Sequence, residues 1–205
     1  MQFLIGPMEW EPSSMLKTIT SVIACIAIVL GCLLSLAKEA DIKTHSVGDK
    51  VPNFEVRTLK GRKITLKDLQ SDGKNNTSGV TVLTFWCSFC GSCRMVDKPL
   101  SELSQKYEGK VAILALDASA GEQARTISKV LKEKNLEMPV LIDSQGNLAD
   151  LFGAKMTTTT VVIDANNVVR YWGQFRQGDK ALAEEAVEAV LAGKNPRQEH
   201  TRERG

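Results

Sequence analysis

Near-continuous apolar runs mark the middle of the chain. Residues 80–86 and 111–116 are apolar at almost every position, and residues 139–142 form a shorter apolar run. A strand that is buried on both faces shows such runs instead of alternating polar and apolar residues. The three runs therefore predict buried strands at the centre of a sheet.

Apolar residues at helical spacing lie between and after these runs. Residues 95–107 and 122–135 each place apolar side chains on one helix face, and Pro99 is expected to kink the first of these helices. The rest of the pattern predicts short strands at 51–56 and 63–66, a short helix at 147–152 ended by Gly153, a hairpin of 160–163 with 168–172, and a last helix at 179–191. This order is typical of an α/β domain with a mixed central sheet and helices on both faces.

A segment of 20 uncharged residues lies between Lys17 and Lys38. As a helix it would span about 30 Å of hydrocarbon, so it predicts a membrane anchor. The residues at 35–37 also fit a signal-peptide cleavage site, and residues 29–32 resemble a lipid-attachment box that ends at Cys32. A buried core helix fits least well, because a core helix needs fewer uncharged residues. The three export interpretations place the rest of the chain outside the cytoplasm, on the periplasmic side of a bacterial-type membrane.

The chain is expected to have four parts. These are a signal or anchor segment at 1–39, a polar linker at 40–49, a globular domain at 50–193, and a charged, disordered tail at 194–205. The formal net charge of +2 comes from interspersed acids and bases, without the basic stripe that nucleic-acid binding needs. Five cysteines are too few for a disulfide-stapled scaffold, and the two histidines, His45 and His200, lie near the domain edges.

Three of the five cysteines fall within seven residues, where the predicted strand 80–86 leads into the next predicted helix. Cys90 is expected at the N-terminus of that helix, with the helix starting near Gly91. Unpaired backbone N–H groups and the helix dipole would stabilise its thiolate there, lowering its pKa from about 8.5. Cys93, one turn later, would attack a mixed disulfide formed at Cys90 and act as the resolving thiol. The small residues Gly91 and Ser92 would let another protein's disulfide approach.

Residues 85–94 resemble the Phe-Trp-x-x-Trp-Cys-x-x-Cys-Arg segment of the thioredoxin superfamily. Residues 48–54 resemble the opening strand signature of that superfamily, and residues 152–164 resemble its return to the sheet after the catalytic site. The likeness covers roughly residues 47–191. It is greatest to membrane-anchored or periplasmic thiol–disulfide oxidoreductases of the cytochrome c maturation type, with an AhpC/TSA- or redoxin-like domain. It implies a thioredoxin-like fold with an N-terminal β extension and a single N-terminal hydrophobic helix.

The resemblance also implies an activity and its partners. Cys90 and Cys93 would exchange a dithiol for a disulfide with protein substrates outside the cytoplasm. The redox-active disulfide would be the only redox group, a recycling partner would supply electrons, and the N-terminal helix would contact the membrane. Substrate contacts are expected at Phe89, Gly91, Ser92, Thr157 and Thr158. The simplest interpretation of Phe89, as of Trp86, is a packing residue, and residues 157–160 also fit a β-favouring run that enters a strand.

Three departures from the family pattern bear on the site. Phe89 replaces the usual tryptophan before the nucleophile, and Cys87 is an additional thiol. Thr158 occupies the position of the family's cis-proline, in the loop that faces the cysteines and helps to hold the substrate chain. A cis bond before a residue other than proline costs about 2.5–4 kcal/mol, which disfavours cis geometry at Thr158.

Other functions fit the same residues. Cys87, Cys90 and Cys93 could bind zinc, copper(I) or an iron–sulfur cluster, although the globular part offers no fourth cysteine and no nearby histidine. Residues 84–87 carry a Thr-x-x-Cys element as peroxiredoxins do, which would make Cys87 the attacking thiol of a peroxidase. Loss of the proline also fits a non-catalytic binding module. The simplest interpretation of Cys87 is a small buried hydrophobe at a strand end.

Overall fold

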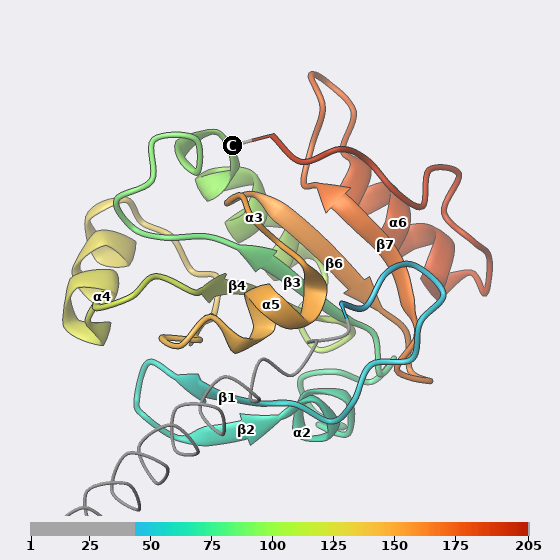
Figure 1. The fold of residues 1–205 in the computed structure, drawn as a ribbon, viewed down its shortest axis with the longest axis horizontal. Helices are drawn as coiled ribbons and strands as arrows, with labels where there is room; N and C mark the ends of the chain where they lie inside the picture. The colour runs from blue at the N-terminus through green and yellow to red at the C-terminus, as the bar shows by residue number, and fades with distance from the viewer. Residues whose placement is uncertain (1–43, 205) are drawn as a thin grey trace, which may run out of the picture. The chain divides into compact units, whose positions relative to one another are not determined.

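A seven-stranded sheet of order β2-β1-β5-β4-β3-β6-β7 organises residues 44–204, the part of the chain that the computed structural model describes (Figure 1). Its strands are β1 (Glu55–Thr58), β2 (Lys63–Thr65), β3 (Thr81–Phe85), β4 (Ala112–Asp117), β5 (Val140–Ile142), β6 (Thr159–Ile163) and β7 (Val169–Gln174). β3 is parallel to β4 and antiparallel to β6. The predicted mixed sheet is therefore confirmed.

The central strands account for the apolar runs in the sequence. Every residue of β3 and of β6 is buried. β4 is parallel to both β3 and β5, and each parallel pair is joined by a crossover that contains a helix. Because helices cover both faces, these strands show no alternation of polar and apolar residues.

Helices lie on both faces of the sheet, as the sequence predicts. They are α2 (Leu66–Gln70), α3 (Arg94–Lys106), α4 (Ala124–Glu133), α5 (Asn147–Phe152) and α6 (Leu182–Leu191). α3, α4 and α6 share one buried core, to which they contribute Val96, Ile127 and Ala183. α2 and α5 pack Leu66 and Phe152 into the core on the other face. In Figure 1, α5 lies in front of the sheet and α3 behind it.

Helix α2 was not predicted from the sequence. The predicted strand at 63–66 ends at Thr65, which caps the helix instead. The Thr65 hydroxyl accepts the Asp68 N–H at 3.2 Å, and the Asp68 carboxylate accepts the Thr65 N–H at 2.8 Å. This reciprocal pair is a capping box, and its Thr-x-x-Asp pattern was present in the sequence.

The charged tail is ordered, which corrects the prediction of disorder from residue 194. The Trp172 N–H donates to the Glu199 carbonyl at 3.0 Å, and the Thr201 N–H donates to the Trp172 carbonyl at 3.1 Å. The rings of Trp172 and His200 stack with their centroids 4.9 Å apart. The tail thus follows the edge strand β7, whose backbone groups supply the partners that its own composition does not reveal.

The predicted N-terminal segment 1–39 and residues 40–43 of the linker lie outside the described residues. Among residues 44–204, no helix has both the length and the apolar character needed to cross a membrane. The described end of the linker contacts the domain, because the His45 N–H donates to the Leu151 carbonyl at 2.8 Å. The Gly48 N–H likewise donates to the Val169 carbonyl at 2.9 Å.

A buried carboxylate on α3 connects this helix to the residue that follows β3 and to the residue that follows α4. Asp97, in the first turn of α3, accepts the Trp86 indole N–H at 2.7 Å and forms an ion pair of 2.6 Å with Lys134. Its side chain is only 9% exposed, whereas that of Lys134 is 36% exposed. Removing the carboxylate would leave the buried indole N–H without a partner and the lysine without its counter-charge.

We therefore expect Asp97→Ala to lower the free energy of unfolding by about 2–3 kcal/mol, measured by urea denaturation of the reduced protein. Lys98→Ala is the matched control, because its exposed pair with Glu102 should contribute less than about 0.5 kcal/mol. Equal stability of the two variants would contradict a structural role for Asp97.

Candidate active site

The junction between β3 and α3 brings the three cysteines together. β3 ends at Phe85, and the Cys90 N–H then donates to the Cys87 carbonyl at 3.3 Å in a turn. The sequence predicts that the helix starts near Gly91, but α3 begins at Arg94 with Cys93 at its N-cap. The three residues before Arg94 form turns instead, so Cys90 lies one turn before the helix and not at its first residue.

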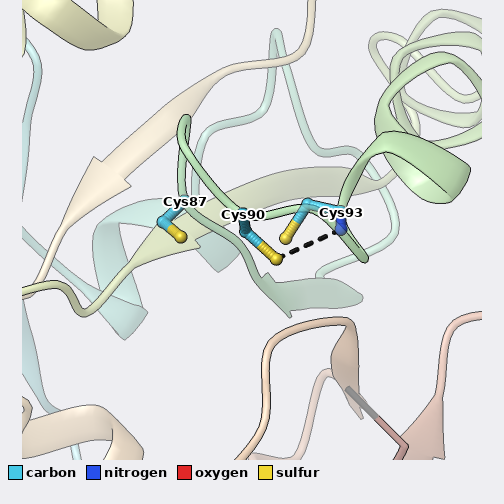
Figure 2. A group of neighbouring side chains, drawn as sticks. All are labelled: Cys87, Cys90 and Cys93. Atoms are coloured by element: carbon cyan, nitrogen blue, oxygen red, sulfur yellow. Dashed lines mark hydrogen bonds between the residues drawn. The ribbon is translucent and has the colours of Figure 1, made fainter.

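Among the three cysteines that the structure describes, Cys90 has the sulfur with the most hydrogen-bonding partners. Its Sγ accepts the Cys93 N–H at 3.1 Å, as Figure 2 shows, and lies 3.0 Å from Ser92 Oγ and 3.1 Å from Thr157 Oγ1. A thiolate has no proton to give, so both hydroxyls donate to Cys90 once it is ionised. One backbone amide and two side chains thus surround a single sulfur.

These contacts make Cys90 the acidic thiol of the site. Partial burial by itself would raise its pKa, but hydrogen bonds from Cys93, Ser92 and Thr157 outweigh that effect and lower the pKa to about 7. A thiol with this pKa ionises around neutral pH. The thiolate is the form of cysteine that attacks a disulfide.

Cys93 has the opposite environment. It is only 1% exposed, and this burial raises the pKa of its thiol to about 12, with the hydrogen bond to Cys90 adding to the effect. The two sulfurs of the pair face one another in Figure 2. An accessible thiolate is therefore backed by a protonated thiol that solvent cannot reach.

Cys87 is buried as well, as its simplest interpretation predicts. Burial is the main cause that raises the pKa of its thiol. The upstream Thr84 is fully buried and lies 3.0 Å from the Thr160 hydroxyl, on the neighbouring strand. The Thr-x-x-Cys element is thus used inside the sheet, and its cysteine lacks the exposure and the low pKa that a peroxide-attacking thiol needs.

Two carboxyl groups, those of Asp117 and Glu122, lie near Cys87, and the sequence analysis did not predict them. Asp117, at the end of β4, is 1% exposed, and burial together with the neighbouring Glu122 carboxyl raises its pKa to about 7. Glu122 accepts the Ser88 hydroxyl and, at 3.3 Å, the Ser88 N–H. The pair therefore holds the cysteine loop against the end of β4.

The loop that carries Thr157 and Thr158 has trans geometry, since the described residues contain no cis peptide bond. Thr158 has a φ of 69°, in the left-handed region that a β-branched residue rarely adopts. Its N–H donates to the Phe85 carbonyl at 2.6 Å, and its hydroxyl donates to the Arg204 carbonyl at 3.1 Å. Of the two threonines predicted to contact substrate, Thr157 faces Cys90 and Thr158 gives its side chain to the tail.

Exposed apolar side chains lie in the segments that carry Cys90 and Thr157. The three most exposed large hydrophobic residues of the described chain are Phe89, Met95 and Met156, at 71%, 69% and 48% exposure. Phe89 precedes Cys90, Met95 lies in the first turn of α3, and Met156 precedes Thr157. The space around Gly91 is open, because an added Cβ there would meet no atom within 4 Å. The predicted contact residues Phe89, Gly91 and Ser92 therefore lie around an approachable sulfur.

The three cysteines also form the set of described residues that could share a metal ion. Their sulfurs lie within 4.8 Å of one another. Three thiolates suit a soft ion such as copper(I), whereas a closed zinc site takes four ligands. Binding would require ionisation of Cys87 and Cys93, whose burial disfavours it.

The sequence that forms this site is similar to the sequences of known proteins. The model of the AhpC/TSA family matches residues 47–172. The thiol-disulfide oxidoreductase ResA of Bacillus cereus is 34% identical over 131 residues, which are 63% of this chain and 70% of that protein. The thioredoxin-like protein YneN of Bacillus subtilis is 28% identical over 60% of this chain and 68% of its own length.

A solved structure agrees with these matches. The putative thiol:disulfide interchange protein DsbE of Chlorobium tepidum has a TM-score of 0.60 and 29% identity, covering 72% of this chain and 99% of that one. The expected thioredoxin-like arrangement of a mixed sheet and flanking helices is thereby confirmed.

We expect the rate of alkylation of Cys90 by iodoacetamide to rise with pH around a midpoint near 7. The rate should level off above about pH 8, because only the thiolate reacts. Thr157→Val should raise that midpoint by about one unit, since it removes a hydroxyl donor from the sulfur. Site-resolved mass spectrometry of the reduced protein gives the rate at each cysteine, and an unchanged midpoint would exclude a role for the Thr157 hydroxyl.

Proposed function

Because this chain belongs to the AhpC/TSA family and is an oxidoreductase of the thioredoxin superfamily, we propose that it exchanges a Cys90–Cys93 dithiol with disulfides of protein substrates outside the cytoplasm. One observation carries the proposal. An approachable sulfur whose pKa is lowered to about 7 lies beside a buried thiol whose pKa is raised to about 12. Disulfide exchange needs these two different thiols, one to attack and one to release.

The reaction balances as two successive displacements. The Cys90 thiolate attacks one sulfur of the substrate disulfide, so a Cys90–substrate bond forms, the substrate S–S bond breaks, and the released substrate thiolate takes a proton. Cys93 then loses its proton and attacks Cys90, which releases the second substrate thiolate. Two electrons have passed from the Cys90–Cys93 pair to the substrate, and the enzyme holds a disulfide.

The mixed disulfide itself activates Cys93. Burial is the main cause of the high pKa of Cys93, and the hydrogen bond and negative charge of Cys90 raise it further. Once Cys90 is bonded to the substrate it carries no charge, so the part of the shift due to Cys90 disappears. The resolving thiol therefore becomes easier to ionise only after a substrate has been captured.

The pKa of Cys90 supports the reducing direction. Thiol pairs whose nucleophile has a pKa of about 7 reach potentials of about −270 mV, whereas those near about 3.5 are oxidants at about −120 mV. A value of about 7 gives Cys90 only moderate thiolate stabilisation. We propose that the pair reduces its substrates and that a second thiol protein reduces it in turn.

The exposed apolar side chains near Cys90 in the chain support a protein substrate. Phe89 and Met95 lie on either side of Cys90 in the sequence, and Met156 precedes Thr157, whose hydroxyl contacts the Cys90 sulfur. Methionine side chains adapt to varied apolar partners, and an aromatic residue adds contact area. A site outside the cytoplasm and attachment to a membrane are supported by the 20 uncharged residues between Lys17 and Lys38.

A second candidate function is binding of a soft metal ion by Cys87, Cys90 and Cys93, favoured by the sulfur separations below 4.8 Å. It requires all three sulfurs to act together, whereas disulfide exchange requires two. Metal analysis of protein purified without oxygen, followed by redox titration with mass-spectrometric mapping of bridges, separates the two functions. Stoichiometric metal would favour the second function, and a reversible Cys90–Cys93 bridge would favour the first.

Cysteine variants give the direct test. Cys90→Ser should abolish reduction of a disulfide-bonded test protein, because it removes the attacking sulfur. Cys93→Ser should accumulate a covalent complex with the test protein, because nothing releases it. Cys87→Ser should keep activity within about twofold, since its sulfur takes no part in the exchange. Loss of activity in Cys87→Ser equal to that in Cys90→Ser would contradict the proposed pair.

The exposed apolar side chains generate a further prediction. Phe89→Ala should lower kcat/KM for a test protein about threefold to tenfold while changing the reaction with a small aromatic disulfide less than about twofold. The reason is that only a protein substrate reaches beyond Cys90 to contact Phe89. Lys129→Ala, a change on the exposed face of α4, serves as the control. Equal losses with both substrates would show that Phe89 acts on the sulfur and not on substrate binding.

A further inference from the structure

The segment of residues 199–204 docks on the sheet at a place built to receive it. The Gln174 N–H donates to the Thr201 hydroxyl at 2.7 Å, and the Gln174 side-chain amide donates to the Arg202 carbonyl at 2.8 Å. Gly173 lies opposite Thr201, and a Cβ at Gly173 would come within 2.8 Å of the Thr201 backbone nitrogen. Only glycine leaves room for so close an approach. Figure 1 shows this segment passing across β7.

The docked segment places the carboxylate of Glu203 beside residues 155–159, in the loop that carries Thr157 and Thr158. A single oxygen of Glu203 accepts the Lys155 N–H at 2.9 Å, the Met156 N–H at 3.3 Å and the Thr159 hydroxyl at 2.8 Å. The donors flank Thr157 on both sides in the sequence. The Glu203 carboxylate thus accepts hydrogen bonds from residues before and after Thr157, and so holds the loop that carries Thr157 and Thr158 at both of its ends.

Hydrogen bonds that restrain this loop matter because its backbone is strained at Thr158. Thr158 adopts a positive φ without the glycine that this region favours, which costs free energy unless surrounding contacts compensate. Contacts from Phe85 and from the Arg204 carbonyl hold Thr158 on either side. In a family whose loop is normally shaped by a proline, residues 203 and 204 supply restraint from a distant part of the chain.

We propose that Glu203 is a positioning residue of the active site, which fixes the 155–158 loop so that the Thr157 hydroxyl stays on the Cys90 sulfur. The distances form a continuous path, from Glu203 through the loop amides to Thr157 and across 3.1 Å to Cys90. The proposal rests on Cys90 being the attacking thiol. It makes residues 199–204 a working part of the site and not only a covering of β7.

The sign of the effect distinguishes positioning from simple electrostatics. A carboxylate near a thiolate repels it, so removing the charge of Glu203 alone would lower the pKa of Cys90. Releasing the loop would instead withdraw the Thr157 donor and raise the pKa. The two explanations therefore predict opposite shifts for the same substitution.

The test measures site-resolved alkylation of Cys90 against pH in the full reduced chain. Glu203→Ala should slow alkylation about tenfold at pH 6, as a rise of one pKa unit requires, and leave the rate above pH 9.5 within about twofold. Glu203→Gln should restore most of the rate at pH 6, because its amide oxygen still accepts the loop N–H groups. Glu199→Ala removes a charge from the same segment and should leave the rate of Cys90 alkylation unchanged.

A double-mutant cycle checks the path through Thr157. In a Thr157→Val background, Glu203→Ala should alter the rate at pH 6 by less than about twofold, since the donor that it positions is already gone. Gly173→Ala, which displaces the segment from β7, should reproduce the tenfold loss if the variant folds; the Glu203 variants decide the matter if it does not.

Each outcome decides the proposal. A Cys90 pKa in Glu203→Ala that is unchanged or lower overturns it, and so does an equal effect of Glu203→Ala with and without the Thr157 hydroxyl. These results leave the proposed function intact, provided that the wild-type midpoint lies near 7. A wild-type midpoint near about 8.5, the ordinary cysteine value, would instead refute the activated thiol on which both proposals depend.

Discussion

The hydrogen bonds to a single sulfur are the interaction on which this structure depends. Cys90 Sγ accepts the Cys93 N–H and faces the hydroxyls of Ser92 and Thr157. Partial burial takes water away from the thiolate, and these donors replace it, so the pKa falls instead of rising. Without them, Cys90 would be protonated at neutral pH, as the buried Cys87 and Cys93 are.

The sheet topology brings those donors to the sulfur. β3 leads into the cysteines, and β6 begins directly after Thr158. Because β3 and β6 are antiparallel neighbours, the end of one lies beside the start of the other. The Thr158 N–H closes this junction by donating to the Phe85 carbonyl at 2.6 Å. The residues 199–204 then secure the same loop from the side of β7, so three segments distant in sequence meet at one site.

Local patterns in the sequence were enough for most elements. The buried strands, the crossover helices and the end of α5 at Gly153 follow from periodicity and from a helix-ending glycine, which act over a few residues. The start of α3 was misplaced because residues 91–93 form turns with similar local preferences. The tail was misread because its charged composition resembles that of a disordered segment, while its order comes from backbone groups of β7.

By itself, the sequence determined the α/β class, the two thiols three residues apart and their place between a strand and a helix. Only the tertiary structure decided which thiol ionises, because the pKa values depend on burial and on donors that folding brings together. Thr157 lies 67 residues from Cys90 in the chain and Glu203 lies 46 residues beyond Thr157, yet both reach one loop. A contact between such distant residues has no local pattern to reveal it, since it exists only once the strands have paired.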